Sequence, residues 1–530
     1  MRIRWLALVC GAVLVTLGPL SPALAATQGG YVAISGSGSS WSSVAMDQWA
    51  ENLHPNGIVI NFNPDGSAAG RADYIQQQVD FAASDPPFRN GTDPFDTGGA
   101  EHPDVGYSYV PDTAGGTAFI YHLDVGGHLI TNLRLSGETI MKIFSGQITN
   151  WDDPEITKDY GARLPSIPIV PVIRSDGSGA TYFLTRWMAH EFPAAWNAFC
   201  AKMSHGRVGG PGKPCGETEF YPQFPGAVPQ NGSNNVATYI TAAYGQGAIG
   251  YDEYAYALNS HYPVVAMENP AGFFVLPTAS NVAVALTEAQ INEDSASKDF
   301  LQQDLDNVYT FSDPRSYPLS SYSYLIVPRQ GTPAPDGFSG GDGKTLSTFI
   351  DYFLCAGQRY SAELGYSPLP LNLVEGGLLQ GSKIPGAIPA PSLATNCDNP
   401  TLKNGQLVVL ENAPKPSPCQ KVGTPLNCVV VKGKAVAAGS AAAAGAAGAT
   451  GGPSAGPSAS TAADGTGTAL SGTQQTATAQ APVTGTVVNL YSSDSNPRLF
   501  GFLTVAFIAI VVAAPPAIYA VTRRRRRAPE

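Results

Sequence analysis

The segment Arg174-Ser175-Asp176-Gly177-Ser178-Gly179-Ala180-Thr181 lies between an apolar run at 167–173 and a helix-like run at 181–190. A strand that ends in a short Gly/Ser loop and opens directly into a helix is typical of layered α/β folds. Glycines let a backbone come close to a ligand, and the unpaired N–H groups at a helix start favour an anion. The segment therefore predicts an α/β fold with an anion-binding loop.

The same kind of junction occurs twice more toward the N-terminus. Residues 36–41 read Gly-Ser-Gly-Ser-Ser-Trp, and residues 65–70 read Asp-Gly-Ser-Ala-Ala-Gly. One such loop alone is ordinary helix capping, because Ser and Gly are common at helix N-termini. Three loops, one of which carries Arg174, favour a tetrahedral oxyanion held by neutral donors and one guanidinium.

Strand-like and helix-like runs alternate from about residue 30 to residue 400, which predicts α/β layers. We expect a Ser136 cap before the third helix. The expected strands are 31–34, 58–62, 80–83, 117–121, 167–173 and 248–251, and the expected helices are 46–52, 69–78, 139–144, 181–190, 235–244 and 346–355.

The chain is acidic, with a formal net charge of −11. Seven of its basic residues are arginines at the two extreme ends (Arg2, Arg4 and 523–527), so the remainder is more acidic still. Such a surface repels nucleic acid and anionic lipid. Neutral donors in a dehydrated cleft can still hold an anion, because salt screens the distant surface charges.

Both ends of the chain indicate export and a membrane anchor. Residues 1–25 have the charged start, apolar run and small-residue end of a signal peptide, and Cys10 lacks the context expected for lipid attachment. Residues 499–521 carry no charge and are long enough to span a bilayer. The arginines in 522–530 place that tail in the cytoplasm and the preceding chain outside. Residues 433–490 are rich in Ala, Gly, Ser and Thr, which predicts a flexible tether.

Six cysteines remain after the signal peptide, and an even number outside the cytoplasm suggests disulfides. Of the possible pairings, the sequential one closes the shortest loops: Cys200 with Cys215, Cys355 with Cys397, and Cys419 with Cys428. The last cysteines fall in an extension at 401–432, beyond the folded region expected at 26–400. Whether that extension packs back on the fold stays open at this point.

Several further motifs accompany the three junctions. They are Phe81-Ala82-Ala83-Ser84-Asp85, Gly115-Gly116, and the runs 143–151 (IFSGQITNW), 247–251 (GAIGY), 253–257 (EYAYA) and 364–370 (LGYSPLP). With these motifs the sequence resembles the phosphate-binding component of bacterial high-affinity phosphate ABC transporters. The resemblance covers about 30–386. It implies a periplasmic-binding-protein-like fold of two α/β lobes around a ligand cleft with a hinge, to which the C-terminal transmembrane helix is added.

The resemblance also implies site residues, carried over by motif. In the first loop Ser40 replaces the usual Thr and Trp41 the usual Phe. In the last loop Ala180 stands where the family usually has Thr, so one side-chain donor is missing; a helical step points Thr181 elsewhere. The implied phosphate-binding residues are Ser40, Trp41, Ser67, Asp85, Arg174, Asp176 (as the partner of Arg174), Ser178, Gly179 and Ala180.

Asp85 is the residue expected to select the ligand. A carboxylate beside an anion is costly unless it accepts a proton from that anion, and hydrogen phosphate carries such a proton whereas sulfate does not. An unpaired buried acceptor costs about 1–3 kcal/mol, and a site that demands a hydrogen bond can reject a ligand lacking it by roughly 10⁴-fold. Taken alone, Asp85 before Pro86-Pro87 would be interpreted as a cap or turn residue.

Two other classes of function compete with binding for transport. A hydrolase is disfavoured because 176–179 lacks the glycine spacing of a nucleophile elbow, and the histidines show no metal-binding spacing. A surface-anchored oxyanion sensor or adhesion protein on the same fold stays open. The resemblance implies that the protein binds inorganic phosphate and meets the permease subunits of an ABC transporter. We further expect a monomer that is not an enzyme and needs no cofactor or metal.

Overall fold

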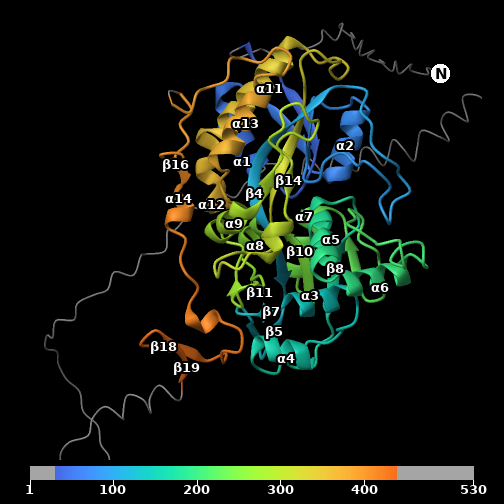
Figure 1. The fold of residues 1–530 in the computed structure, drawn as a ribbon, viewed down its shortest axis with the longest axis vertical. Helices are drawn as coiled ribbons and strands as arrows, with labels where there is room; N and C mark the ends of the chain where they lie inside the picture. The colour runs from blue at the N-terminus through green and yellow to red at the C-terminus, as the bar shows by residue number, and fades with distance from the viewer. Residues whose placement is uncertain (1–29, 395, 439–530) are drawn as a thin grey trace, which may run out of the picture. The chain divides into compact units, whose positions relative to one another are not determined.

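The computed structural model describes residues 30–394 and 396–438, and an eight-stranded sheet runs through them (Figure 1). The strand order is β2-β1-β3-β15-β4-β10-β8-β9. The strands are β1 (Ile34–Gly38), β2 (Ile60–Asn63), β3 (Phe81–Ser84), β4 (Tyr107–Tyr121), β8 (Val170–Arg174), β9 (Val228–Gln230), β10 (Ala248–Glu253) and β15 (Ser320–Pro328).

The long strand β4 belongs to two lobes. Its first part pairs antiparallel with β15, which also pairs with β3, and β1 lies parallel between β3 and β2. Its last part, from Thr117, pairs antiparallel with β10, and β8 lies parallel between β10 and β9. The first lobe is therefore built on β1, β2, β3 and β15, and the second lobe on β8, β9 and β10. The change of partner falls between Gly116 and Thr117.

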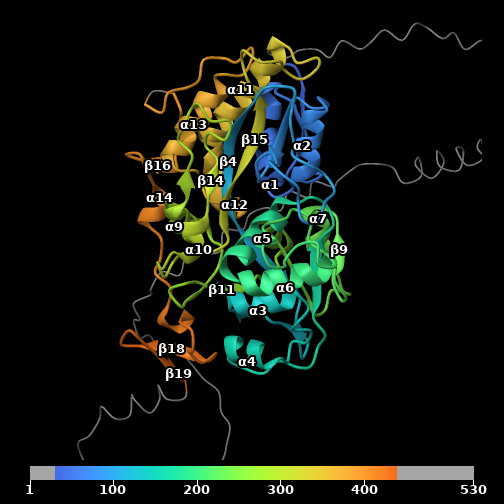
Figure 2. The same ribbon diagram turned by 45° about the vertical axis from the view of Figure 1, so that its right-hand side comes forward.

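Helices cover both lobes, and their apolar faces form the core against the sheet (Figure 2). The α/β fold class expected from the alternating pattern is confirmed. The helices are α1 (Ser43–Leu53), α2 (Ser67–Ile75), α3 (Gly137–Phe144), α4 (Pro154–Tyr160), α5 (Gly179–Glu191), α6 (Pro193–Met203), α7 (Gly232–Thr241), α8 (Tyr254–Ser260), α9 (Ala279–Ala285), α10 (Asp306–Thr310), α11 (Gly340–Leu354), α12 (Ser361–Leu364), α13 (Leu371–Gly381) and α14 (Val408–Glu411).

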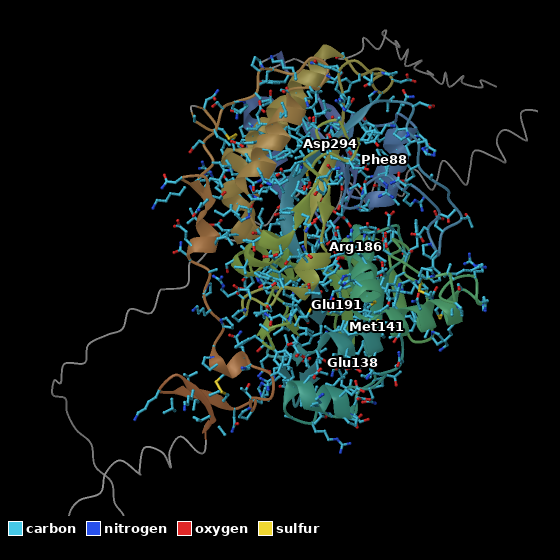
Figure 3. All side chains as sticks on the ribbon, viewed as in Figure 1. Phe88, Glu138, Met141, Arg186, Glu191 and Asp294 are labelled. Carbon is cyan, nitrogen blue, oxygen red and sulfur yellow. A yellow bond between two sulfur atoms is a disulfide. The ribbon has the colours of Figure 1, made fainter. Side chains whose placement is uncertain are left out.

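The two lobes also contain short strands. Two ion pairs join α5 to one of these strands and to α10. Arg186 on α5 forms ion pairs with Asp304 at 2.7 Å and Asp306 at 3.0 Å (Figure 3). The short strands are β5 (Asp124–Val125), β6 (His128–Leu129), β7 (Arg134–Leu135), β11 (Ala266–Glu268), β12 (Phe274–Val275), β13 (Gln290–Ile291), β14 (Gln303–Asp304), β16 (Leu402–Lys403), β17 (Gln406–Leu407), β18 (Cys428–Val431) and β19 (Lys434–Ala437).

Most expected elements are present, but several boundaries were wrong. The strand expected at 31–34 shares only Ile34 with β1, which runs through the Gly/Ser residues to Gly38 because that stretch pairs with β2 and β3. The helix expected at 235–244 begins at Gly232 and ends at Thr241. The expected cap is confirmed, since the Ser136 side chain accepts a hydrogen bond from the Thr139 N–H.

The C-terminal extension packs back on the folded region, which answers the question the sequence left open: its start lies against α9 and α13, and its end lies on the second lobe. Arg134 donates to the Thr424 carbonyl at 2.5 Å, and Lys421 forms a β-bridge with Phe273. Strands β18 and β19 pair as a hairpin. The expected start of the tether at 433 is therefore wrong, because β19 lies inside that range.

All three sequential disulfides are confirmed: Cys200–Cys215, Cys355–Cys397 and Cys419–Cys428. Within residues 30–394 and 396–438, no helix is both long and apolar enough to cross a bilayer. The signal peptide and the helix expected at 499–521 lie outside the described residues, as does most of the expected tether.

Candidate oxyanion-binding site

Two segments of the first lobe bring hydroxyl groups to Asp85, the residue after β3. Ser39, directly after β1, donates to both carboxylate oxygens, at 2.9 and 2.8 Å. Ser67, the first residue of α2, donates to Oδ2 at 3.0 Å. Asp85 is buried, and this burial raises the pKa of its carboxyl even though the serine hydroxyls and Arg174 lower it. Asp85 thus sits among neutral donors at the carboxyl ends of parallel strands.

The second lobe contributes a charged cluster around Arg174, the last residue of β8. The guanidinium is 2% exposed and forms a fork with Asp176, with Nε donating to Oδ1 at 2.8 Å and Nη2 donating to Oδ2. Nη2 also donates to the Ser40 hydroxyl at 2.9 Å, and Nη1 donates to the Ser233 hydroxyl at 3.1 Å. Arg174 therefore reaches across to the first lobe through Ser40.

Carboxylates hold the guanidinium charged inside the protein. Asp252 Oδ2 lies 3.5 Å from Arg174 Nη1. Burial lowers the pKa of Arg174, but Asp176 and Asp252 outweigh it and the net shift is upward. Burial raises the pKa of Asp176, but Arg174 outweighs it and the net shift is downward. For Asp252, burial prevails over Arg174 and raises the pKa to about 6.

The start of α5 meets Asp85 closely. A Cβ built on Gly179 would lie 1.7 Å from Asp85 Oδ2, so only glycine allows this approach of the two lobes. The Ser178 side chain caps α5 by accepting from the Thr181 N–H at 3.4 Å. Ala180 is fully buried, and the Thr181 hydroxyl bonds to the Tyr251 hydroxyl at 2.8 Å. As the helical step predicts, Thr181 does not face Asp85.

Trp41 follows the first loop and packs between the lobes. Its N–H donates to the Ser39 hydroxyl at 3.1 Å, and its carbonyl accepts from the Tyr366 hydroxyl at 2.7 Å. Its ring meets Phe183 of α5 edge-on, with ring centroids 6.5 Å apart. Trp41 therefore holds the Ser39 hydroxyl of the first lobe and packs its ring against α5 of the second lobe.

Three residues of this site were missed by sequence reasoning: Ser39, Ser233 and Asp252. Ser39 stands inside the quoted first loop, next to the chosen Ser40. Ser233 follows β9 in the run Asn231-Gly232-Ser233 at the start of α7, so a fourth strand-loop-helix junction was there to be found. Asp252 lies within β10, and an acid in a buried strand gives no such signal.

Behind the site lies a further buried acid, Asp112 on β4. One of its oxygens, Oδ1, accepts from the Thr113 N–H at 2.6 Å. Burial first, and then the negative charge of Asp85, raises the pKa of Asp112 to about 8. Asp112 is therefore uncharged near neutral pH, which limits the negative charge beside Asp85.

A family model described as a PBP superfamily domain matches residues 22–356, more than half of the chain. The chain therefore belongs to the periplasmic-binding-protein superfamily, whose α/β fold it has. A phosphate-binding protein PstS from Xylella fastidiosa is 30% identical over 346 residues, which cover 65% of this chain and 83% of that relative. The PstS 2 phosphate-binding protein of Mycobacterium tuberculosis is 26% identical over 351 residues, covering 64% and 84%. Within the superfamily, the chain belongs to the family of PstS phosphate-binding proteins.

Two solved structures are similar at a lower level. The ancestral soluble variant of the human phosphate binding protein is 17% identical, with a TM-score of 0.49 and coverage of 69% of this chain and 99% of that one. A phosphate ABC transporter substrate-binding protein from Clostridium perfringens is 19% identical, with a TM-score of 0.39 and coverage of 64% and 100%. Neither likeness bears on the ligand of this chain.

Proposed function

We propose that this chain binds inorganic phosphate between its two lobes. The observation that carries the proposal is the pairing of Asp85, among serine hydroxyls, with Arg174, which reaches the opposite lobe through Ser40. An anion with three bare oxygens and one protonated oxygen matches such a set, because donors and the guanidinium hold the bare oxygens while Asp85 accepts the proton. The relatives named above are phosphate-binding proteins, which supports the same ligand.

The proposed binding residues are those that the family motifs imply, with three additions. Ser39 holds the Asp85 carboxylate, while Ser233 and Asp252 hold Arg174. Ser178 supplies its hydroxyl as a donor rather than its N–H, because the hydroxyl oxygen only accepts from the Thr181 N–H, while the Ser178 N–H already donates to the Glu219 carbonyl. Ala180 contributes its backbone N–H only.

Calorimetry of the full chain with phosphate, arsenate and sulfate tests the proposal. We expect one saturable site for phosphate, and much weaker binding of sulfate because sulfate leaves the Asp85 acceptor without a proton. Equal heats and equal affinities for phosphate and sulfate would show that Asp85 does not select.

The same proposal places the binding domain outside the cytoplasm and supplies phosphate to a membrane permease. The signal peptide at 1–25 exports the chain, and the helix at 499–521 anchors it. About 60 residues separate the described part from that helix, which as flexible chain have a root-mean-square span of roughly 40–45 Å. Such a tether keeps the receptor near its permease and raises the effective concentration of each for the other.

Reconstitution with the ABC permease tests delivery. Phosphate-loaded protein should stimulate ATP hydrolysis by the permease, and protein without phosphate should stimulate it less. Phosphate binding with no effect on any phosphate permease of the same organism would favour a surface sensor instead. Turnover of a chromogenic phosphate ester, lost on mutating Asp85 or Arg174, would overturn the proposal that the chain binds without catalysis.

A further inference from the structure

A buried ion pair joins the two lobes beside the candidate site. Arg71 lies on α2, which begins at Ser67 and packs on the first lobe, and its side chain is fully buried. Its Nε lies 2.7 Å from Glu101, and its Nη1 donates to the Ser84 hydroxyl at 2.9 Å. Both of these partners belong to the first lobe. Its Nη2 lies 2.6 Å from Glu219.

Glu219 belongs to the second lobe. The neighbouring Thr218 exchanges two hydrogen bonds with Thr185 of α5, at 2.8 and 2.9 Å. The Glu219 carbonyl accepts from the Ser178 N–H at 3.0 Å, which fixes the loop that opens α5. The Arg71–Glu219 pair therefore connects α2, which carries Ser67, to the loop that carries Ser178.

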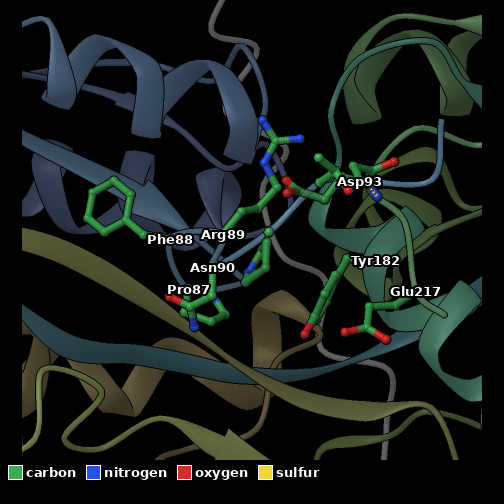
Figure 4. A pocket seen from close by; sticks show the side chains of 11 residues that line it. Pro87, Phe88, Arg89, Asn90, Asp93, Tyr182 and Glu217 are labelled. Atoms are coloured by element: carbon green, nitrogen blue, oxygen red, sulfur yellow. Dashed lines mark hydrogen bonds between the residues drawn. The ribbon is translucent and has the colours of Figure 1, made fainter. Parts of the chain in front are cut away.

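Asp93 makes a second crossing at the same place. It lies in the connection between β3 and β4 of the first lobe, and it accepts from the Thr218 hydroxyl at 2.6 Å and from the Glu219 N–H at 3.0 Å. Beside these contacts lies a cavity of about 300 Å³ whose lining includes Arg89 and Asp93 from the first lobe and Tyr182, Glu217 and Glu219 from the second (Figure 4). The crossing contacts thus lie at an opening between the lobes.

The energetic consequence follows from burial. When the lobes touch, Arg71 and Glu219 are both withdrawn from water, and Arg71 pairs with Glu219 as well as with Glu101. Burial outweighs the opposing effects of Arg71 and Arg89 and raises the pKa of Glu219, so the charged carboxylate is costly without its ion pair to Arg71. When the lobes part, Glu219 can be hydrated, while Arg71 keeps its pair with Glu101 of the same lobe. Removing one charge therefore penalises the joined state and leaves the parted state nearly unchanged.

We propose that Arg71 and Glu219 are positioning residues that latch the two lobes together and set how slowly the bound oxyanion leaves. The inference rests on the proposed function, because it assigns the closed state to the liganded protein. Neither side chain touches Asp85 or Arg174 in the described structure. Arg71 acts on the site through Ser67, which begins its helix α2. Glu219 acts through Ser178, whose N–H donates to the Glu219 carbonyl.

Stopped-flow tryptophan fluorescence on the full chain with inorganic phosphate tests the latch. Glu219→Gln keeps the shape of the side chain but removes its charge. We expect phosphate to dissociate about 10- to 100-fold faster, with association changed by less than about threefold, because loss of a buried charge partner acts mainly on dissociation. The melting temperature without phosphate should stay the same, and the upward shift caused by phosphate should shrink.

Glu101→Gln is the matched control, because Glu101 also pairs with Arg71 but from the same lobe. It should lower the melting temperature with and without phosphate alike and leave the dissociation rate unchanged. Arg71→Lys, which keeps the charge but loses the fork, should accelerate dissociation less than Glu219→Gln. Equal dissociation rates in wild type and Glu219→Gln, or equal acceleration in Glu101→Gln, would overturn the latch. Absence of phosphate binding in the wild type would instead overturn the proposed function.

Discussion

The two lobes meet the candidate ligand position with opposite chemistry. The first lobe offers a carboxylate, Asp85, surrounded by the serine hydroxyls of Ser39 and Ser67. The second lobe offers a guanidinium, Arg174, surrounded by the carboxylates Asp176 and Asp252. This contrast between the lobes explains how an acidic protein could take up an anion. Under the proposed function, the second lobe supplies the attraction and the first lobe tests whether the anion carries a proton.

The largest expected effect comes from removing the charge of the second lobe. Arg174→Ala should abolish phosphate binding in calorimetry, since loss of one partner of a buried pair costs about 3–5 kcal/mol. Arg315→Ala is the control, because Arg315 pairs with Asp313 at 2.8 Å and is partly exposed. Retained micromolar binding in Arg174→Ala would show that the second lobe does not supply the attraction.

The next effect comes from the proton check of the first lobe. Asp85→Asn should weaken phosphate binding by about 1–3 kcal/mol. It should improve sulfate binding relative to phosphate binding, since the amide can donate to a bare oxygen. Asp80→Asn is the control: Asp80 also accepts from a serine hydroxyl, that of Ser35, at 3.1 Å. An unchanged sulfate-to-phosphate ratio in competition calorimetry would remove the functional contrast between the lobes.

A smaller effect on phosphate affinity is expected at the contact between the two lobes. Ser233 bonds both to Arg174 and, at 2.8 Å, to the Ser40 hydroxyl of the first lobe. Ser233→Ala should weaken phosphate by about 1 kcal/mol, close to fivefold, because one hydrogen bond to a charged group is lost. Ser347→Ala, at a buried serine on α11, should leave the affinity unchanged. A loss as large as that of Arg174→Ala would mean that Ser233 orders the whole cluster.

The last effect concerns stability rather than binding, and it comes from Asp112, behind the first lobe's carboxylate. Its pKa rises from 3.8 to about 8 on folding, so the folded protein holds one more proton than the unfolded chain between these values. Its contribution to the free energy of unfolding should therefore fall as pH rises from about 4 to 8. Urea unfolding at several pH values should show a steeper decline in wild type than in Asp112→Asn. Parallel curves would mean that Asp112 is already charged.

The sequence predicted the fold well because each junction carries its signal in adjacent residues. The strand β8, its loop and the helix α5 follow one another along the chain, so apolar runs and glycines were enough. The same local signal was present at Ser233, where it was overlooked. The predicted element boundaries were wrong where strand pairing overrides composition. The Gly/Ser residues 36–38 resemble a loop in composition, yet they form the end of β1 between β2 and β3.

What the sequence could not predict depends on contacts between distant segments. Nothing near Asp252 indicates that it faces Arg174, since the two lie on neighbouring strands far apart in the chain. The pairing of Arg71 with Glu219 spans 148 residues and both lobes. Similarly, Arg134 donates to the carbonyl of Thr424, 290 residues along the chain, and so attaches the end of the C-terminal extension to the second lobe.

A crystal structure of the protein with phosphate tests the contrast between the lobes most directly. We predict one phosphate ion with one oxygen within hydrogen-bond distance of the Asp85 carboxylate and another within that distance of the Arg174 guanidinium. A phosphate ion bound by only one of these two groups, or seated in the cavity lined by Arg89 and Glu217, would contradict the account.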